Sequence, residues 1–452
     1  MNNYNPPRMI DVYTAEKEKS FSVVSLFAGC GGSSTGYRLA GGNVLAANEF
    51  MEAARNIYSK NYPHTYIFPQ DIRKLSGQDI LKKIGLEKGQ LDLLDGSPPC
   101  ASFSQSGIRE EAWGKEKKYS NTVQRVDDLF YEYARILKEI QPKVFIAENV
   151  KGLTAAKAKT ILGSRSKSLK SFFSFEKETL DNGMDETIAE TLRNCGYNVS
   201  YKVLDASHFG VPQKRERLIF IGVRNDLDLK PSFPKGFTKT SPILGKEVLL
   251  DLLFNGSEAN LKSDSKNFWY LKNFIKPHTS RSDIVKIKRL NKLNLFEQRF
   301  NRDNWNNLHL TILQADFANV FHSVVDRYMS IDEAKRIQTF PEDFDFLISG
   351  KRRELVSLTD LESIEFDYSN NQSGINSGNL YDICKFAGIE YDQIKSDKMF
   401  QLDVKTETFD EKDYRKKSAK AWEFCGRAVP PLLMKCIASH VNENILKKVK
   451  TK

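Results

Sequence analysis

The stretch Phe21-Ser22-Val23-Val24-Ser25-Leu26-Phe27-Ala28-Gly29-Cys30-Gly31-Gly32-Ser33-Ser34-Thr35-Gly36 joins an apolar run to a cluster of glycines. The run 21–27 predicts a β-strand, and Tyr37-Arg38-Leu39-Ala40 continues as a helix. A strand, a glycine turn and a helix make a nucleotide-type cradle, because glycine lets the backbone approach a ligand and the helix N-terminus favours an anionic group. A dinucleotide fingerprint would need a third glycine where Ser34 stands, so a nicotinamide or flavin cofactor is disfavoured.

Acidic residues follow the next two extended segments. A second strand over 44–47 ends at Asn48-Glu49-Phe50, and an acid at this place can accept hydrogen bonds from a ribose. Asp71 ends a third short segment and is a candidate acceptor for an adenine amino group. A solvated loop acid explains Asp71 equally well.

A cysteine lies on a stiff loop after another buried strand. The apolar run Leu91-Asp92-Leu93-Leu94 leads into Asp95-Gly96-Ser97-Pro98-Pro99-Cys100-Ala101-Ser102-Phe103-Ser104. Chemistry in parallel sheets sits at the carboxyl ends of strands, and two prolines restrict the backbone before Cys100. From this segment alone, Cys100 can be either a nucleophile or a small buried apolar residue.

A carboxylate and two arginines complete the candidate site. The apolar strand 143–147 runs into Glu148-Asn149-Val150, which places an acid in the same layer as Cys100. Arg215 and Arg217 precede the apolar run 218–223, and side chains two apart on a strand share a face. The pair predicts an anion clamp, with a charged strand edge as the alternative.

The pattern of elements predicts an α/β fold with a catalytic domain and a smaller second domain. Further elements are predicted as helices over 127–140 and 185–194, a strand over 197–204, and a helix from a Ser330-x-x-Glu333 capping box to Pro341. The polar segment 101–124 is predicted to be a mobile lid. The predicted parts are a tail at 1–20, a catalytic and cofactor-binding domain at 21–223, a basic irregular domain at 224–310, a returning helix at 311–346, an insertion of unassigned role at 347–420 and a C-terminal helix at 421–452.

Composition narrows the class of protein. The 452 residues carry a formal net charge of +10, which favours a polyanionic partner such as nucleic acid. The six cysteines show no Cys-x-x-Cys spacing, so neither a zinc site nor a disulfide framework is predicted. No segment has the pattern of a signal peptide or the apolar length of a membrane span, so an intracellular protein without membrane contact is expected.

Six blocks, in order, resemble those of the DNA cytosine-5 methyltransferase family, in its bacterial modification methylase form. The blocks are Phe27-Ala28-Gly29-Cys30-Gly31-Gly32, Gly96-Ser97-Pro98-Pro99-Cys100, Glu148-Asn149-Val150, Gln213-Lys214-Arg215-Glu216-Arg217, Arg336-Ile337-Gln338-Thr339-Phe340-Pro341 and Gly426-Arg427-Ala428-Val429-Pro430-Pro431. The resemblance covers about 21–223, 310–346 and 422–446. It implies a Rossmann-like, S-adenosylmethionine-dependent methyltransferase fold, with a smaller irregular target-recognition domain at 224–310.

The resemblance also implies roles for individual residues. Cys100 would add to carbon 6 of cytosine, Glu148 would protonate ring nitrogen 3, Asn149 would position that loop, and Arg215 with Arg217 would hold the base carbonyl and a phosphate. No metal is needed. The residues implied to bind S-adenosylmethionine are Phe27, Ala28, Gly29, Gly31, Gly32, Glu49, Phe50, Asp71, Ile72, Pro98 and Leu129.

The implied substrate is double-stranded DNA with a flipped-out cytosine, and the implied setting is a monomer in a bacterial cytoplasm, with a cognate restriction endonuclease as a possible partner. An RNA cytosine-5 methyltransferase and a catalytically silent DNA-binding protein on this fold are the alternatives. The RNA branch usually carries Cys-Phe-Thr, whereas Cys100-Ala101-Ser102 stands here. Ala101, where Gln or Asn is common, Arg427, where Asn is common, and the long interval from Phe346 to Gly426 depart from the family pattern.

Overall fold

The computed structural model describes residues 4–98, 117–119, 122–124, 129–155, 184–253, 301–302, 305–314, 320–325, 327–348, 351–357, 384–385, 399–405 and 410–450. The chain divides into two compact units. Unit 1 comprises Met1–Met9, Ala206–Arg215 and Gly236–Leu432, and unit 2 comprises Ile10–Asp205, Glu216–Lys235 and Leu433–Lys452.

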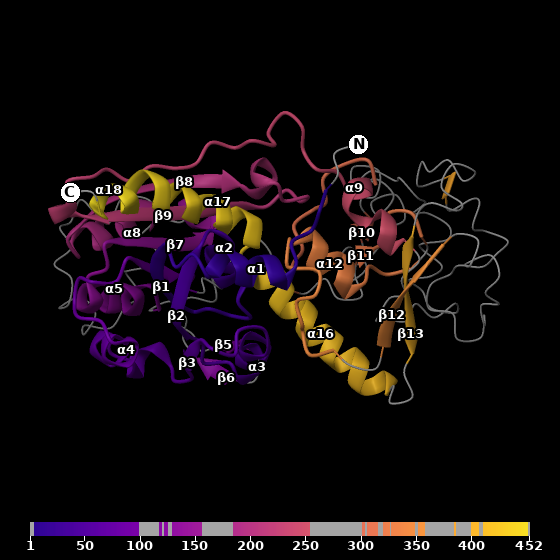
Figure 1. The fold of residues 1–452 in the computed structure, drawn as a ribbon, viewed down its shortest axis with the longest axis horizontal. Coiled ribbons are helices and arrows are strands. Elements are labelled where there is room, and N and C mark those ends of the chain that lie inside the picture. Colours follow the sequence, from indigo (N-terminus) through magenta and orange to yellow (C-terminus); the bar gives the residue numbers. More distant parts are fainter. Residues whose placement is uncertain are drawn as a thin grey trace. The chain divides into compact units, whose positions relative to one another are not determined.

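A seven-stranded sheet forms the centre of unit 2 (Figure 1). Its order is β3 (Tyr66–Phe68), β2 (Gly42–Asn48), β1 (Phe21–Leu26), β4 (Leu93–Gly96), β7 (Val144–Val150), β9 (Glu216–Arg224) and β8 (Tyr197–Asp205). The strands from β3 to β7 are parallel, whereas β9 runs antiparallel to both β7 and β8. The sheet confirms the predicted α/β class and brings the carboxyl ends of β1, β2, β4 and β7 to one edge.

Helices cover both faces of this sheet. On one face, α4 (Gly77–Ile84), α5 (Leu129–Ile140) and α8 (Met184–Arg193) contribute to an apolar cluster that includes Phe145 and Phe220. On the other face, α2 (Gly32–Leu39) places its Tyr37 hydroxyl 2.9 Å from the Asp95 carboxylate of β4. The sheet is therefore buried on both sides, as its near-continuous apolar strands require.

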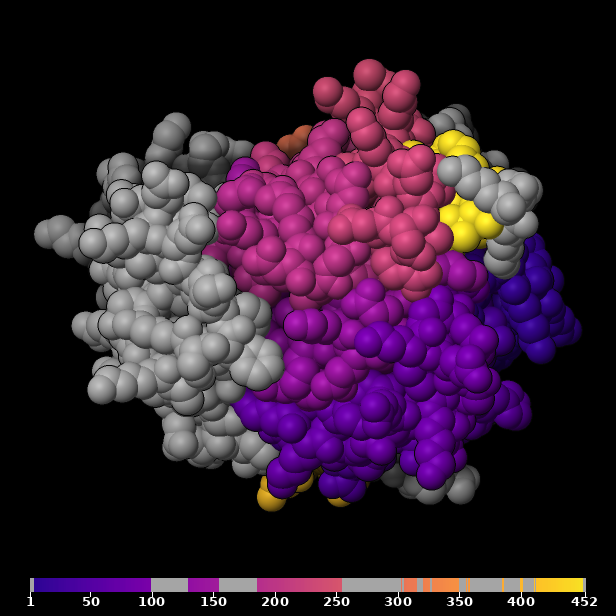
Figure 2. Space-filling view, turned by 90° about the vertical axis from the view of Figure 1, so that its left-hand side faces the viewer, coloured from indigo at the N-terminus to yellow at the C-terminus, as the bar shows by residue number. Residues whose placement is uncertain are grey.

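Shorter elements complete unit 2. They are α3 (Glu52–Asn61), η1 (Ile72–Lys74), η2 (Lys151–Ala155), η5 (Asn225–Leu227), a π-helical turn at η8 (Asn442–Leu446), α18 (Lys447–Lys450) and the antiparallel pair β5 (Lys117–Tyr119) and β6 (Thr122–Gln124). Residues 225–235, after β9, run along the surface with half-buried or exposed side chains (Figure 2). α1 (Met9–Glu16) and α17 (Pro431–Val441) each contain a boundary between the units. Among the described residues, no helix is both long enough and apolar enough to cross a bilayer.

Unit 1 contains shorter elements. They are η4 (Ala206–Phe209), α9 (Gly245–Leu249), η6 (Leu250–Leu252), a parallel pair of β10 (Asn301–Arg302) and β11 (Val320–Phe321), α12 (Ile331–Ile337), an antiparallel pair of β12 (Lys351–Val356) and β13 (Phe400–Lys405), and α16 (Glu411–Arg427). The predicted capping box at the start of α12 is confirmed, since the Ser330 hydroxyl accepts from the Glu333 N–H and the Glu333 carboxylate accepts from the Ser330 N–H.

The helices of the sequence prediction are confirmed at α5 and α8, but two strands end later than their apolar runs. β4 continues through Asp95 and Gly96, and β7 continues through Glu148 to Val150. Asp95 is therefore a strand residue, and its side chain finds hydrogen-bond partners inside the fold. The acid Glu148 consequently projects from a strand rather than from the loop after it.

Candidate active site

The glycine turn after β1 forms a cradle of left-handed backbone. Phe27, Gly29 and Gly31 have φ angles of 55°, 57° and 103°. A positive φ is uncommon for a bulky residue such as Phe27, and strained backbone of this kind clusters at ligand-binding sites. Among the residues that the structure describes, and apart from the two chain neighbours of Gly29, no atom lies within 4 Å of the position that a side-chain carbon on Gly29 would take. The turn thus presents its backbone to open space.

Glu49, which follows β2, is tied to this turn. Its carboxylate accepts hydrogen bonds from the Gly29 N–H at 2.9 Å and from the Met51 N–H at 2.7 Å, and the residue is 8% exposed. An ionised carboxylate offers about four acceptor sites, so Glu49 retains capacity for ribose hydroxyls. The open turn fits the methionine part of S-adenosylmethionine, and the adjacent Glu49 carboxylate fits its ribose.

Asp71 has local hydrogen-bond and ion-pair partners that its position in the sequence did not predict. It caps η1 by accepting from the Arg73 N–H at 3.0 Å, and it forms an ion pair with the Arg73 guanidinium at 2.9 Å. Asn48, which the sequence analysis did not single out, donates from its amide to the carbonyls of Phe68 and Gln70. Asn48 therefore joins the ends of β2 and β3 and fixes the segment that carries Asp71.

The other predicted cofactor residues vary in burial. Gly32 begins α2, Ala28 donates its N–H to the Asn48 carbonyl, and Phe50 is half-buried. Ile72, Pro98 and Leu129 are buried. Whether they touch the cofactor stays a prediction.

Glu148 and Arg217 form an ion pair across β7 and β9. The Arg217 Nε lies 2.8 Å from the Glu148 Oε1, and both side chains are largely buried. Burial lowers the pKa of the Arg217 guanidinium and the Glu148 charge opposes this, so the arginine stays charged. The pair places an acid and a cation at the carboxyl end of β7.

Asn149 contacts the chain just before the predicted nucleophile. Its amide Nδ2 lies 3.4 Å from the Pro98 carbonyl oxygen, and its Oδ1 accepts from the Val150 N–H at 2.8 Å. This contact links β7 to the segment after β4, and the loop-positioning role of Asn149 stays a prediction. Cys100, Ala101 and the lid residues 101–116 lie outside the described residues.

Arg215 and Arg217 contact different groups in the structure. Arg215 precedes β9, is 1% exposed, and donates to the backbone carbonyls of Ile312, Gly426 and Ala428 at 2.9–3.1 Å. β9 begins at Glu216, so only Arg217 belongs to the strand predicted to give the two arginines a shared face, and their joint action on an anion stays a prediction. Arg215 instead joins three segments of unit 1.

Comparison with known proteins identifies the fold and its chemistry. A family model described as C-5 cytosine-specific DNA methylase matches residues 21–357. The chain belongs to this family. It is therefore a DNA cytosine-5 methyltransferase, with S-adenosylmethionine as its methyl donor.

Relatives of this methyltransferase include bacterial modification enzymes. The Type II methyltransferase M.NgoPII of Neisseria gonorrhoeae is 29% identical over 342 residues, which are 72% of this chain and 86% of that protein. The Type II methyltransferase M1.HphI of Haemophilus parahaemolyticus is 28% identical over 341 residues, covering 74% and 80%. A solved structure of a proposed DNA modification methyltransferase from an E. coli prophage has 18% identity and a TM-score of 0.53, covering 94% of this chain and 99% of that chain. The last likeness concerns the fold alone.

A buried acid beside the site escaped the sequence analysis. The Asp95 carboxylate of β4 accepts from the Ser25 hydroxyl at 2.6 Å and from the Tyr37 hydroxyl at 2.9 Å. Burial raises the pKa of Asp95 to about 7; the two hydrogen bonds oppose this and the Glu148 charge adds to it. The only sequence signal is an acid inside an otherwise apolar strand.

Arg427, which departs from the family pattern, has partners within unit 1. Its Nη2 lies 2.6 Å from the Glu423 Oε1, and its Nε donates to the Gln314 side chain at 2.5 Å. The long side chain thus fastens the end of α16 to the segment before 315. No contact with a cofactor is needed to explain it.

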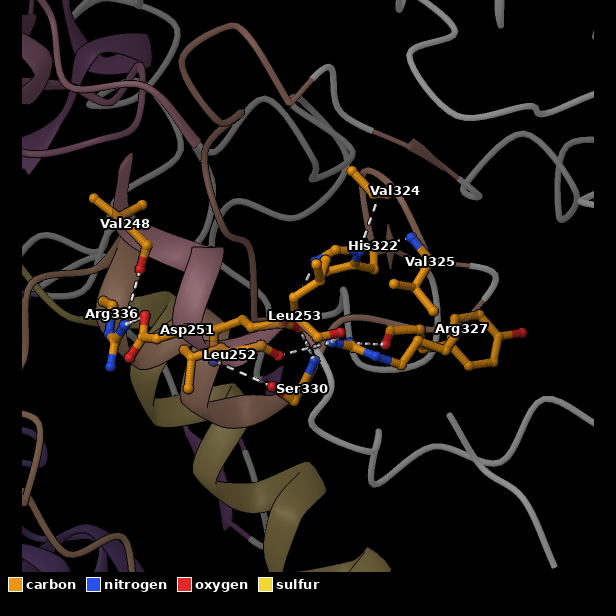
Figure 3. A network of polar contacts seen from close by, with 12 residues as sticks. Val248, Asp251, Leu252, Leu253, His322, Val324, Val325, Arg327, Ser330 and Arg336 are labelled. Carbon is orange, nitrogen blue, oxygen red and sulfur yellow. Dashed lines mark hydrogen bonds and ion pairs between the residues drawn. The ribbon is translucent and has the colours of Figure 1, made fainter. Parts of the chain in front are cut away.

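Unit 1 contains a buried polar network around His322 (Figure 3). Arg327 forms a two-point ion pair with Glu333 at 2.7 and 2.9 Å, and both side chains are 0% exposed. The His322 Nδ1 accepts from the N–H groups of Val324 and Val325, so the ring proton is on Nε2, 3.2 Å from the Glu333 carboxylate.

The same network reaches both ends of the segment 254–300. Arg327 donates to the carbonyls of Leu252 and Leu253, and Arg302 donates to the carbonyls of His322 and Val324. Residues 254–300 lie outside the described residues. The network therefore fixes where this segment leaves and rejoins the rest of unit 1.

Proposed function

We propose that this enzyme methylates carbon 5 of a flipped-out cytosine within a specific duplex sequence, as the modification half of a bacterial restriction-modification system. The Type II relatives support the setting, and the Glu148–Arg217 pair beside the Pro98 segment is the observation that supports the chemistry. A monomer in the bacterial cytoplasm, with a cognate endonuclease as partner, belongs to the same proposal.

Cys100 is the proposed nucleophile. Carbon 5 of cytosine is a poor nucleophile within an aromatic ring, and addition of the thiolate to carbon 6 turns it into an enamine carbon. S-adenosylmethionine supplies an electrophilic methyl group when bound. Carbon 5 bonds to that methyl group, the methylated adduct loses its carbon 5 proton to a base, and the carbon 6–sulfur bond breaks to release the cysteine as a thiolate. Asn149 holds the Pro98 carbonyl and thereby restrains the approach to Cys100.

Glu148 is the proposed acid at ring nitrogen 3. Addition at carbon 6 pushes electrons into the ring, and a protonated carboxyl at nitrogen 3 receives them by giving its hydrogen bond or proton. Arg217, now paired with Glu148, has a guanidinium suited to the base carbonyl. When Arg217 turns to the base, the carboxylate loses its cation and its affinity for a proton rises.

The cofactor cradle is proposed to consist of the turn at 27–32 and Glu49. The open space at Gly29 accommodates the methionine part near the backbone, and Glu49 accepts from the ribose. Asp71 and Ile72 follow β3 and are proposed to border the adenine. Target recognition is proposed for 224–310, which is basic and lies where the family has its recognition domain, whereas 347–420 has near-balanced charge.

Duplex DNA that contains 5-fluorocytosine tests the proposal. The fluorine cannot leave as a proton does, so wild-type enzyme with S-adenosylmethionine should form a stable covalent complex that survives denaturing gel electrophoresis. Cys100→Ala should form none, yet should bind DNA as tightly in a mobility-shift assay. A covalent complex in the variant would place the nucleophile elsewhere.

A further inference from the structure

A row of polar side chains crosses the sheet of unit 2 on the face opposite to α5. Asp95 lies in register with Ser25 of β1, and the register of β4, β7 and β9 places Glu148 one diagonal step from Asp95, and Arg217 one diagonal step from Glu148. Side chains at alternate positions share a face. Four adjacent strands therefore contribute Ser25, Asp95, Glu148 and Arg217 in that order.

Asp95 is held rigidly within this row. It is 1% exposed, and its two carboxylate oxygens accept from Ser25 and Tyr37. Within the described part of the chain, the titratable groups around it are Tyr37 on α2, Tyr133 on α5 and Glu148 on β7. Burying a carboxyl is costly, and an apolar residue would stabilise a strand interior more. A buried acid with fixed partners beside a reacting group is typical of a functional role.

The charge on Asp95 acts on Glu148 in the direction opposite to that of Arg217. The Glu148 charge contributes to the raised pKa of Asp95, and a Coulombic interaction is mutual. A nearby carboxylate favours the protonated form of its neighbour, whereas a guanidinium favours the ionised form.

We propose that Asp95 is a positioning residue whose carboxylate keeps a proton on Glu148 once Arg217 has turned to the base. The inference rests on the proposed role of Glu148 as the acid. It extends the reaction's machinery by one strand, from β7 to β4. Asp95 itself touches neither cytosine nor cofactor in this scheme.

The test is the pH dependence of single-turnover methyl transfer from labelled S-adenosylmethionine to duplex DNA, with Asp95→Asn against wild type. The amide keeps the shape and removes the charge. Burial raises the pKa of Asp95 to about 7, so its charge is largely absent in acid and present in alkali, and the two profiles should coincide in acid and separate in alkali. The alkaline limb of the variant should move down by about one pH unit, which is roughly a tenfold lower rate at a fixed alkaline pH.

Asp92→Asn is the matched control. Asp92 also belongs to the β4 segment and is buried, but its carboxylate pairs with the Lys143 ammonium at 2.7 Å and with Ser22. Its loss should leave the alkaline limb in place. A downward shift of equal size in Asp92→Asn would overturn the inference, because the effect would then not depend on the neighbour of Glu148.

Two further variants distinguish a failure of the proposed acid role of Glu148 from a failure of the proposed role of Asp95. Glu148→Gln with wild-type activity would overturn the proposed function, whereas an inactive Glu148→Gln together with an unshifted Asp95→Asn profile would overturn only the role of Asp95. If Asp95→Asn does not fold, Ser25→Ala tests the role of Asp95 instead. This variant removes the hydrogen bond from the Ser25 hydroxyl to the Asp95 carboxylate, so Asp95 ionises at higher pH. At a fixed alkaline pH, the methyl-transfer rate of Ser25→Ala should be lower than that of the wild type by less than tenfold. An unchanged rate in this pH range would refute the inference.

Discussion

Glu333→Gln should destabilise unit 1 far more than an ordinary ion-pair deletion. The amide keeps the shape and can still accept from the Ser330 N–H, so the change removes mainly the charge. Arg327 then remains as a buried cation without its counter-charge. Removing one partner of a buried pair costs about 3–5 kcal/mol.

The lower end of that range applies here, because Arg327 keeps three carbonyl acceptors. They are Tyr328 at 3.0 Å, Leu252 at 3.3 Å and Leu253 at 3.4 Å, of which two are long. The expected loss is therefore about 3 kcal/mol, equivalent to more than a hundredfold in an opening equilibrium.

Hydrogen exchange followed by mass spectrometry measures this loss of stability segment by segment. A local measurement is needed because a chain of two units need not unfold in a single transition. Amides of α12 and β11 should exchange about a hundredfold faster in Glu333→Gln, and amides of β7 should not change. Asp413→Asn is the control, because its ion pair with Lys417 is 50% and 43% exposed and should contribute less than about 0.5 kcal/mol. Acceleration below about tenfold in α12 would refute the reasoning.

Three further predictions concern other parts of the chain. Glu49→Ala should weaken S-adenosylmethionine binding by about 1–3 kcal/mol in calorimetry, with the maximal rate restored by excess cofactor; unchanged affinity would mean another group holds the ribose. Burial, followed by nearby arginine charges, lowers the pKa of His322 well below 6.5. As pH falls below about 6.5, His322 therefore binds a proton in the unfolded chain but not in the folded chain, and the free energy of unfolding should fall by up to about 1.4 kcal/mol per pH unit. His322→Gln should flatten this loss in urea unfolding, and a change at the exposed His64 should not. Grafting 224–310 from a methyltransferase of different target should move sequence specificity with it in bisulfite sequencing, whereas a variant shortened within 347–420 that methylates a new sequence would contradict this assignment.

Much of the sheet and its edge could be predicted from local sequence. Apolar runs bounded by glycine or proline mark β1, β4 and β7, since strands buried on both faces read as continuous apolar segments. Parallel strands meet at their carboxyl ends, so Glu49 and Glu148 could be placed at one edge without any knowledge of contacts. The family blocks lie on these same segments, which is why the predicted positions of the glycine turn and of Glu148 in the sheet agree with the structure.

The role of Arg215 could not be predicted in this way. Its three carbonyl partners lie 97, 211 and 213 positions along the chain. Alternation along a strand assigns a face only while the strand lasts, and β9 begins one residue after Arg215. Backbone carbonyls that bind a guanidinium carry no side-chain signature, so no pattern in the sequence marks them.

Asp95 shows why strand ends are hard to place from hydrophobicity near a catalytic edge. The apolar run stops at Leu94, yet β4 continues because the Ser25 and Tyr37 hydroxyls supply the partners that a buried carboxyl requires. Those hydroxyls come from β1 and α2, elements that the sequence assigns to the cofactor cradle. The same β1–α2 unit therefore carries both the Gly29 backbone of the proposed cofactor cradle and the hydroxyls that hold Asp95, which is next to Glu148 in the polar row. If the proposed roles of Gly29 and Glu148 hold, a change in this unit alters both cofactor binding and the protonation of Glu148.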